Sequence, residues 1–119
     1  MQIRLFDSEL KVMDVLWSDG EMTAGQMAVA LKAQTGWNRN TTYTVIKKLI
    51  EKGAIERYEP NFGCRALIGK EQVQQAEATE LVGKLFGGAA DAFLAAFLSG
   101  KTLSVDEIAR LKRIVDELE

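Results

Sequence analysis

The stretch that decides the fold is TTYTVIKKLIEKGAIERYEPNFGCRALIG, residues 41–69. In its first half, apolar side chains recur at helical spacing: Val45, Ile46, Leu49 and Ile50. The other side carries Asn40, Thr41, Thr44, Lys47, Lys48 and Glu51, so the spacing predicts a helix over 40–52 that ends at Gly53. The second half predicts two short strands, 54–59 and 64–68, joined by the turn PNFG.

Two more helices are predicted before this stretch. The first covers 8–17, with Asp7 or Ser8 as its N-cap. The second begins at Thr23, which forms a capping box with Gln26. Three short helices followed by a hairpin are typical of a winged helix-turn-helix domain. The fold class predicted for residues 1–69 is therefore mainly α with a small β-hairpin.

Three further helices are predicted over residues 70–119, and the last begins with a second capping box, Ser104 with Glu107. Their apolar side chains have little neighbouring mass to pack against, and a monomer would expose a large apolar patch. The residues concerned are Leu81, Leu85, Phe86, Phe93, Leu94, Phe97, Leu98, Ile108, Leu111 and Val115. We expect this region to be a helical dimerisation region that joins two copies of the chain. The alternative is that it folds back on its own first domain.

The composition is that of an ordinary globular protein, with 47% apolar and 27% charged residues in 119. No run approaches the roughly 20 apolar residues of a membrane helix, and the N-terminus lacks an export signal, so no membrane insertion is expected. One cysteine, Cys64, fits a reducing compartment. We therefore expect a cytoplasmic protein.

The chain contains no histidine, which removes the common nucleophile–base pairs and most zinc or copper sites. Magnesium held by carboxylates alone remains conceivable, but no paired acids occur in a recognisable loop. We expect no enzyme activity, no metal and no cofactor.

Charge is distributed unevenly. The net charge is −2, yet residues 32–70 hold eight basic and three acidic side chains, whereas 71–119 hold five and nine. A local basic patch suits phosphate binding, although it also fits a solvated surface.

The polar side of the central helix, capped by Asn38 or Asn40, suits a DNA-recognition helix. Threonine hydroxyls can bond bases or phosphates, and lysines suit phosphates or guanine. Three threonines in four residues are poor helix formers, which suggests a role other than stability. The candidate DNA contacts are Arg39, Asn40, Thr41, Thr42, Tyr43, Thr44, Lys47 and Lys48 on the helix, with Arg57, Asn61 and Arg65 on the hairpin.

Some alternatives stay open. The Tyr43 hydroxyl reaches a phosphate, or its ring covers the apolar edge of the helix. A second alternative is that the threonines have no binding role and that the lysines only keep the helix soluble. Finally, winged folds also serve as protein–protein interaction modules without DNA binding.

Five segments carry a resemblance that extends over nearly the full length: ELKVMDVLW, TAGQMAVAL, NTTYTVIKKLIEKGAIERY, KLFGG and FLSGKTLSVDEIARLKRIV. In these the chain resembles the penicillinase-repressor family of bacterial transcription regulators, the BlaI/MecI type. The resemblance implies a homodimeric repressor on an inverted-repeat promoter operator, with the helix 40–52 in the major groove of double-stranded DNA. The family's base-reading positions fall on Thr41, Tyr43, Thr44 and Lys47.

The resemblance also bears on regulation. In β-lactam-responsive members, a membrane sensor or protease relieves repression by cleavage at an Asn–Phe bond. That bond aligns with Ala96–Phe97, where the Phe agrees and the Asn does not. The cysteine cluster of the copper-responsive branch has no counterpart. Cys64 is expected to be a packing residue, with a redox switch as the alternative.

Overall fold

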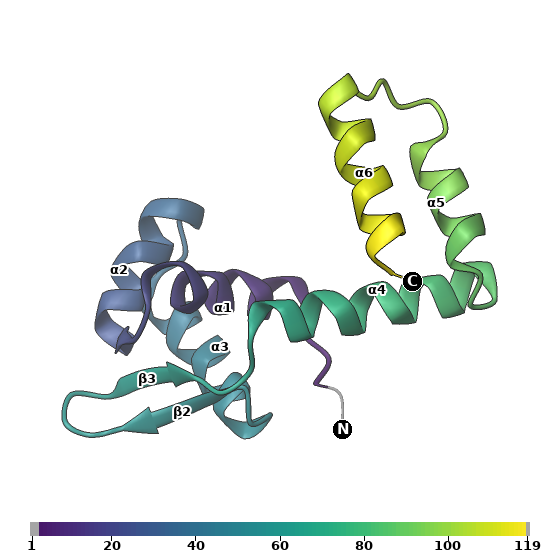
Figure 1. Ribbon diagram of the computed structural model, residues 1–119. Helices are drawn as coiled ribbons and strands as arrows, with labels where there is room; N and C mark the ends of the chain where they lie inside the picture. Colours follow the sequence, from purple (N-terminus) through teal and green to yellow (C-terminus); the bar gives the residue numbers. More distant parts are fainter. Residues whose placement is uncertain (1–2, 119) are drawn as a thin grey trace. The chain divides into compact units, whose positions relative to one another are not determined.

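The computed structural model describes residues 3–118, which form six helices and a three-stranded antiparallel sheet (Figure 1). The elements are α1 (Asp7–Asp19), β1 (Met22–Thr23), α2 (Ala24–Thr35), α3 (Arg39–Glu51), β2 (Ile55–Tyr58), β3 (Gly63–Ala66), α4 (Lys70–Phe86), α5 (Ala90–Leu98) and α6 (Val105–Glu117). They divide into two units, Met1–Ala78 and Thr79–Glu119. The predicted mainly helical class with a small hairpin is confirmed.

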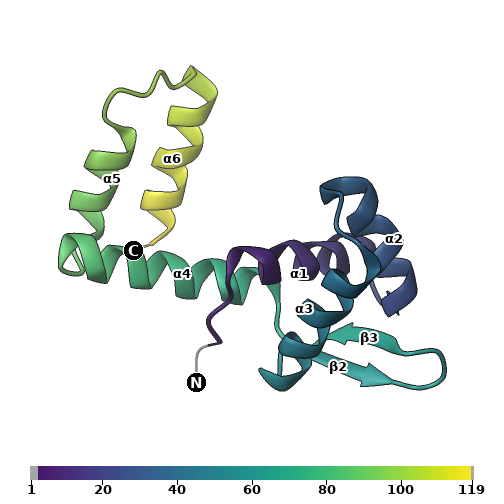
Figure 2. The ribbon, with the colours of Figure 1, turned by 180° about the vertical axis from the view of Figure 1, so that it is seen from behind.

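The first unit packs α1, α2 and α3 around one core and against the sheet, whose strand order is β1-β3-β2 (Figures 1 and 2). The largest fully buried apolar side chains are Met13, Met27, Leu31, Ile46, Leu49 and Ile55. The sequence did not predict β1, which pairs Met22 with Cys64 and Thr23 with Gly63. Two residues are too few to show the alternating pattern of a strand.

Side-chain caps set where the helices begin. In α2 the predicted capping box is confirmed, because the Gln26 amide donates to Thr23 Oγ1 at 3.1 Å and Gln26 Oε1 accepts from the Thr23 amide at 2.9 Å. Asn38 caps α3, since its Oδ1 accepts from the Thr41 amide at 2.8 Å. The predicted cap of α1 is wrong. Phe6 holds the N-cap position, and Glu9 Oε1 accepts from its amide at 2.8 Å.

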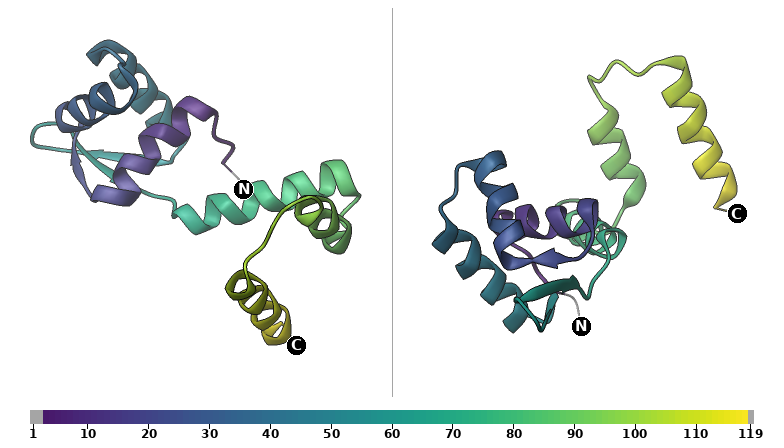
Figure 3. Two further views of the ribbon diagram at one scale, coloured as in Figure 1. Left: turned by 90° about the horizontal axis from the view of Figure 1, so that it is seen from above. Right: turned by 90° about the vertical axis from the view of Figure 1, so that its left-hand side faces the viewer.

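The second unit contains the end of α4 followed by α5 and α6, which run antiparallel side by side (Figures 1 and 3). The second capping box is confirmed, with both bonds between Ser104 and Glu107 at 3.1 Å. The division between the units falls within α4, whereas the predicted boundary is at 69/70, where α4 begins. Val73 in the first turn of α4 is buried with the core of the first unit.

Within residues 3–118, no helix alone is long and apolar enough to cross a membrane, although α4 and α5 taken as a bent pair meet the length and composition requirement.

Candidate nucleic-acid interface

The helix α3 has one buried and one exposed side. Val45, Ile46 and Leu49 pack into the core, whereas the opposite side carries exposed polar side chains. Those side chains are Arg39, Asn40, Thr41, Thr44, Lys47 and Lys48. The structure therefore brings together six of the eight predicted α3 contacts on one exposed surface.

Hydrogen bonds within α3 hold the exposed threonines. Thr41 Oγ1 donates to Asn38 Oδ1 at 3.0 Å, and Thr44 Oγ1 donates to the Asn40 carbonyl at 2.9 Å. Each hydroxyl keeps its lone pairs, so it can still accept a hydrogen bond from a ligand. Neither Lys47 nor Lys48 forms an ion pair with an acid in the part of the chain described, so both charges face solvent.

Thr42 does not belong to this surface, which corrects the predicted set of contacts. Its side chain is fully buried, and its hydroxyl has no hydrogen-bond partner within residues 3–118. The position lies three residues before Val45 and four before Ile46, so helical geometry turns it toward the core with them. Thr42 cannot reach a ligand without unfolding of the helix.

Tyr43 lies at the edge of the surface and is half-buried. Its hydroxyl accepts from Arg39 Nη2 at 2.8 Å, and the Arg39 guanidinium carbon lies 4.9 Å from the ring centroid. The ring meets Phe62 of the hairpin edge to face, with centroids 5.7 Å apart. The ring therefore joins α3 to the hairpin, while the hydroxyl is held by Arg39.

We call the whole hairpin, residues 55–66, the wing, and its tip turns through Asn61 and Phe62. Both have positive φ, at 67° and 56°, and Asn61 is exposed. Asparagine adopts this conformation more readily than most residues. The Phe62 carbonyl accepts from the Ala24 amide at 2.9 Å, which ties the turn to the start of α2.

Both predicted arginine contacts of the wing have acidic partners. Arg57 Nε lies 3.1 Å from Glu59 Oε2. Arg65 Nε lies 2.8 Å from Glu21 Oε1, and Arg65 Nη1 pairs with Glu56. The hydrogen bond from Arg65 lowers the pKa of the Glu21 carboxyl, and the bond to Glu21 raises the pKa of Arg65. The wing is therefore less positive than its arginines alone imply.

The second unit exposes much of the predicted apolar set. Six of the ten residues are exposed, namely Leu81, Leu85, Leu94, Phe97, Ile108 and Val115. The remaining four, Phe86, Phe93, Leu98 and Leu111, are half-buried within the unit. Sequence reasoning missed Ile114, which is 57% exposed and follows Leu111 at helical spacing.

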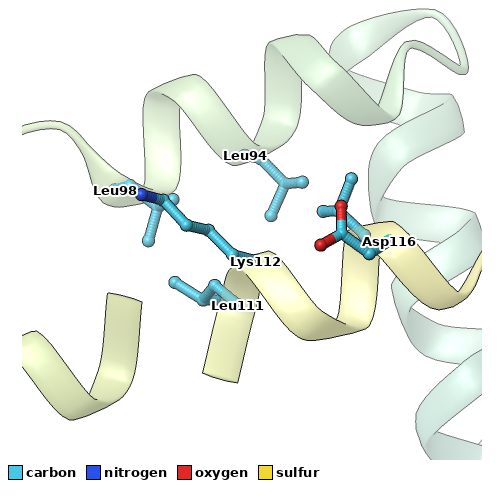
Figure 4. A pocket seen from close by; sticks show the side chains of 6 residues that line it. Leu94, Leu98, Leu111, Lys112 and Asp116 are labelled. Atoms are coloured by element: carbon cyan, nitrogen blue, oxygen red, sulfur yellow. The ribbon is translucent and has the colours of Figure 1, made fainter. Parts of the chain in front are cut away.

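A pocket of about 310 Å³ lies between α5 and α6. Leucines line it, with Leu94 and Leu98 from α5 and Leu111 from α6, and Lys112 and Asp116 lie beside them (Figure 4). The ring of Phe93 contacts Phe86 edge to face and stacks on Phe97, at centroid distances of 5.7 and 5.8 Å. No residue of α5 or α6 is buried, and several large apolar side chains of the unit stay exposed.

Comparison with known proteins identifies the family. A family model described as Penicillinase repressor matches residues 5–117. The chain belongs to the penicillinase repressor family. The match spans both units, and the resemblance predicted from the sequence is confirmed. Penicillinase repressors form a family of transcriptional repressors and not of enzymes.

Named relatives of this penicillinase repressor family member are distant but match nearly end to end. Methicillin resistance regulatory protein MecI of Staphylococcus aureus strain N315 is 25% identical over 112 residues, covering 92% of this chain and 91% of that protein. The penicillinase repressor of Bacillus licheniformis is 24% identical over 116 residues, covering 96% and 91%. The solution structure of the DNA-binding domain of the repressor BlaI has a TM-score of 0.55 at 25% identity, over 59% of this chain and 88% of that domain.

The cleavage bond expected from the penicillinase repressor family lies in α5. Ala96 and Phe97 are both exposed, in the second half of that helix. Cleavage at this bond stays a prediction.

Cys64 is buried in the core of the first unit, as expected of a packing residue, and burial raises the pKa of its thiol to about 11. In the part of the chain that the structure describes, no group of three or more His, Cys, Asp or Glu side chains is placed to hold a metal.

Proposed function

We propose that this protein is a sequence-specific DNA-binding transcriptional repressor that acts as a homodimer on an inverted-repeat operator. In this proposal α3 enters the major groove, the wing lies beside the phosphate backbone, and the second unit joins two copies. The half-sites would then lie one helical turn apart, about 34–36 Å, or a multiple of it. The names of the relatives, a resistance regulator, a penicillinase repressor and a repressor's DNA-binding domain, support this assignment.

The observation that carries the proposal is the exposed polar side of α3. The major groove, about 12 Å wide, accepts one helix whose side chains reach base edges. The hydroxyl of Thr44 can bond a base and its methyl can meet a thymine methyl. Within residues 3–118, Lys47 and Lys48 form no ion pair with an acid. Because the core holds the other side of the helix rigidly, these groups form a preorganised surface.

The homodimer rests on the apolar surface of the second unit. Soluble monomers rarely expose contiguous apolar patches beyond a few hundred Å². Here Leu85, Phe97 and Val115 are each more than half exposed. A second copy of the same unit would cover such side chains symmetrically, and a symmetric dimer fits an inverted repeat. Sedimentation at micromolar concentration should give twice the chain mass, and a monomer would remove this part of the proposal.

The decisive experiment measures electrophoretic shifts with a library of duplexes. We expect Thr44→Ala to relax the sequence preference and Lys48→Ala to weaken binding about equally on all duplexes. The control is Lys11→Ala, an exposed lysine of α1 outside both the α3 surface and the second unit, which should leave the affinity unchanged. Affinity of the unaltered protein should fall steeply with salt, because phosphate contacts release counterions.

Two results would contradict the proposal. One is indifference of DNA binding to both α3 substitutions. The other is a failure of every duplex to bind at low salt. The second result would assign the α3 surface to a protein partner, the alternative function of a winged domain.

A further inference from the structure

The sheet places the two arginines of the wing on opposite faces. In antiparallel strands, directly paired residues point to the same side, and neighbours along a strand alternate. Arg57 pairs with Cys64, which is fully buried, so Arg57 extends from the face of the sheet that covers the core. Arg65 pairs with Glu56 on the outer face. The two guanidinium groups therefore have different surroundings although they lie on adjacent strands.

Arg57 is connected to α3 through a row of alternating cations and rings. Its guanidinium carbon lies 3.8 Å from the centroid of Phe62. Phe62 meets Tyr43 edge to face at an interplanar angle of 77°, and Arg39 lies over Tyr43. The row joins the tip of the wing to the first turn of α3, and each of its ends is a guanidinium group.

These guanidinium groups keep N–H donors for a ligand. A guanidinium has five N–H donors, which suit the oxygens of a phosphate, and within residues 3–118 Arg39 uses one on the Tyr43 hydroxyl and Arg57 uses one on Glu59. Arg57 also pairs with Glu59, but that carboxylate is 66% exposed, so the pair is well solvated and readily replaced.

Arg65 is surrounded differently. Besides its pairs with Glu21 and Glu56, it lies 4.7 Å over the ring of Tyr58, whose hydroxyl donates to Glu21 at 3.2 Å. Gly63 makes room for that ring, because a Cβ there would lie 2.3 Å from Tyr58 Cε2. We call these four side chains, Glu21, Glu56, Tyr58 and Arg65, the outer cluster. Two carboxylates outnumber one guanidinium in it, so its net charge is negative and would repel a phosphate.

We propose that the two wing arginines have different roles. Arg57, positioned by Phe62, and Arg39, positioned by Tyr43, contact the phosphates beside α3. Arg65 contacts no DNA and instead clamps the outer cluster, which holds β2 and β3 to the segment before β1. This inference rests on the proposed function, and it revises the sequence prediction that treated both wing arginines as DNA contacts.

The first test compares the salt dependence of DNA binding for Arg57→Gln and Arg65→Gln in the full chain. Each phosphate contact contributes about 0.9 to the slope of log affinity against log salt. Because a homodimer presents two copies of Arg57, we expect Arg57→Gln to lower that slope by about two and to weaken binding to all duplexes alike. Arg65→Gln should leave the slope unchanged. Because both arginines lie outside the buried core, both variants should fold, which circular dichroism would verify.

A second test examines Phe62 as a positioning residue. Phe62→Leu keeps an apolar side chain but removes the ring under Arg57. Alone, it should weaken DNA binding several-fold without altering the sequence preference, and in the Arg57→Gln background it should have little further effect. If Phe62 had a purely structural role, Phe62→Leu would reduce the DNA affinity equally in the unaltered chain and in the Arg57→Gln variant, and it would lower the unfolding temperature.

The inference is overturned if Arg65→Gln lowers the salt slope as much as Arg57→Gln. It is also overturned if the losses of DNA-binding free energy from Phe62→Leu and Arg57→Gln add fully in the double variant. These outcomes differ from failure of the proposed function, in which the unaltered protein itself would bind no duplex.

Discussion

Replacing Thr42 by valine should stabilise the first unit and leave DNA binding unchanged. Thr42 is fully buried, and its hydroxyl has no hydrogen-bond partner among the described residues. Valine has nearly the same shape, so the substitution removes the unpaired polar group without creating a cavity. Both residues are β-branched and have similar helix propensity, so the backbone contributes little to the difference.

The expected magnitude follows from two effects. Burying a hydroxyl without a partner costs about 1–3 kcal/mol in proteins. The methyl group that replaces it gains roughly 0.8 kcal/mol on burial. A methyl is slightly larger than a hydroxyl, and imperfect packing in a dense core offsets part of the gain. We therefore expect the free energy of unfolding to rise by about 1–2 kcal/mol.

Urea denaturation followed by tryptophan fluorescence is the appropriate assay. The chain has two tryptophans, Trp17 and Trp37, and both belong to the first unit, so the signal reports the unfolding of that unit. The matched control is Thr44→Val on the exposed side of the same helix. It should change stability by less than about 0.5 kcal/mol and should weaken DNA binding.

A loss of stability in Thr42→Val would refute this reasoning, because it would mean that the hydroxyl has a partner such as a buried water. A loss of DNA affinity with stability retained would mean that Thr42 reaches the DNA.

Three further predictions follow from the same structure. Lys52→Met should destabilise the first unit by roughly 2–4 kcal/mol in urea, because it leaves the carboxylate of Glu9 without its cation. Glu9 is 2% exposed, and its Oε1 lies 2.7 Å from the Lys52 ammonium. Adding Glu9→Gln to the Lys52→Met variant should recover part of the lost stability. Cys64, whose pKa burial raises to about 11, should react with iodoacetamide at pH 8 far more slowly in the native protein than in urea, and equal rates would contradict its burial. Arg65 lowers the pKa of Glu21 from 4.5, so their ion pair stabilises the fold above that pH. This stabilisation is lost as the pH falls through the folded-state pKa of Glu21. Arg65→Gln should therefore flatten the acid side of a stability–pH profile, and an unchanged profile would refute the clamp.

The sequence predicted the helix starts best where a short polar side chain caps the backbone. Thr23 with Gln26 and Ser104 with Glu107 are local devices, and both are present as predicted. The start of α1 was missed because Phe6 has no capping oxygen, and Glu9, three residues later, supplies the acceptor.

Two site residues show the limit of inference from residue type. Thr42 is predicted to contact DNA as one of three threonines within four residues, although its spacing to Val45 and Ile46 places it on the buried side. The role of Arg65 follows only from the strand register, which pairs it with Glu56 on the outer face of the sheet. That register depends on a turn in which Asn61 and Phe62 both have positive φ, and the sequence does not reveal this for phenylalanine.

The central claim is tested most directly by selecting bound duplexes from a random pool with the full chain and sequencing them. The account predicts enrichment of an inverted repeat whose half-sites lie about 10 base pairs apart, centre to centre, or a multiple of that spacing. It also predicts that Thr44→Ala degrades the enriched half-site. A recovered pool that matches the input, or one enriched in a single unrepeated site, would contradict it.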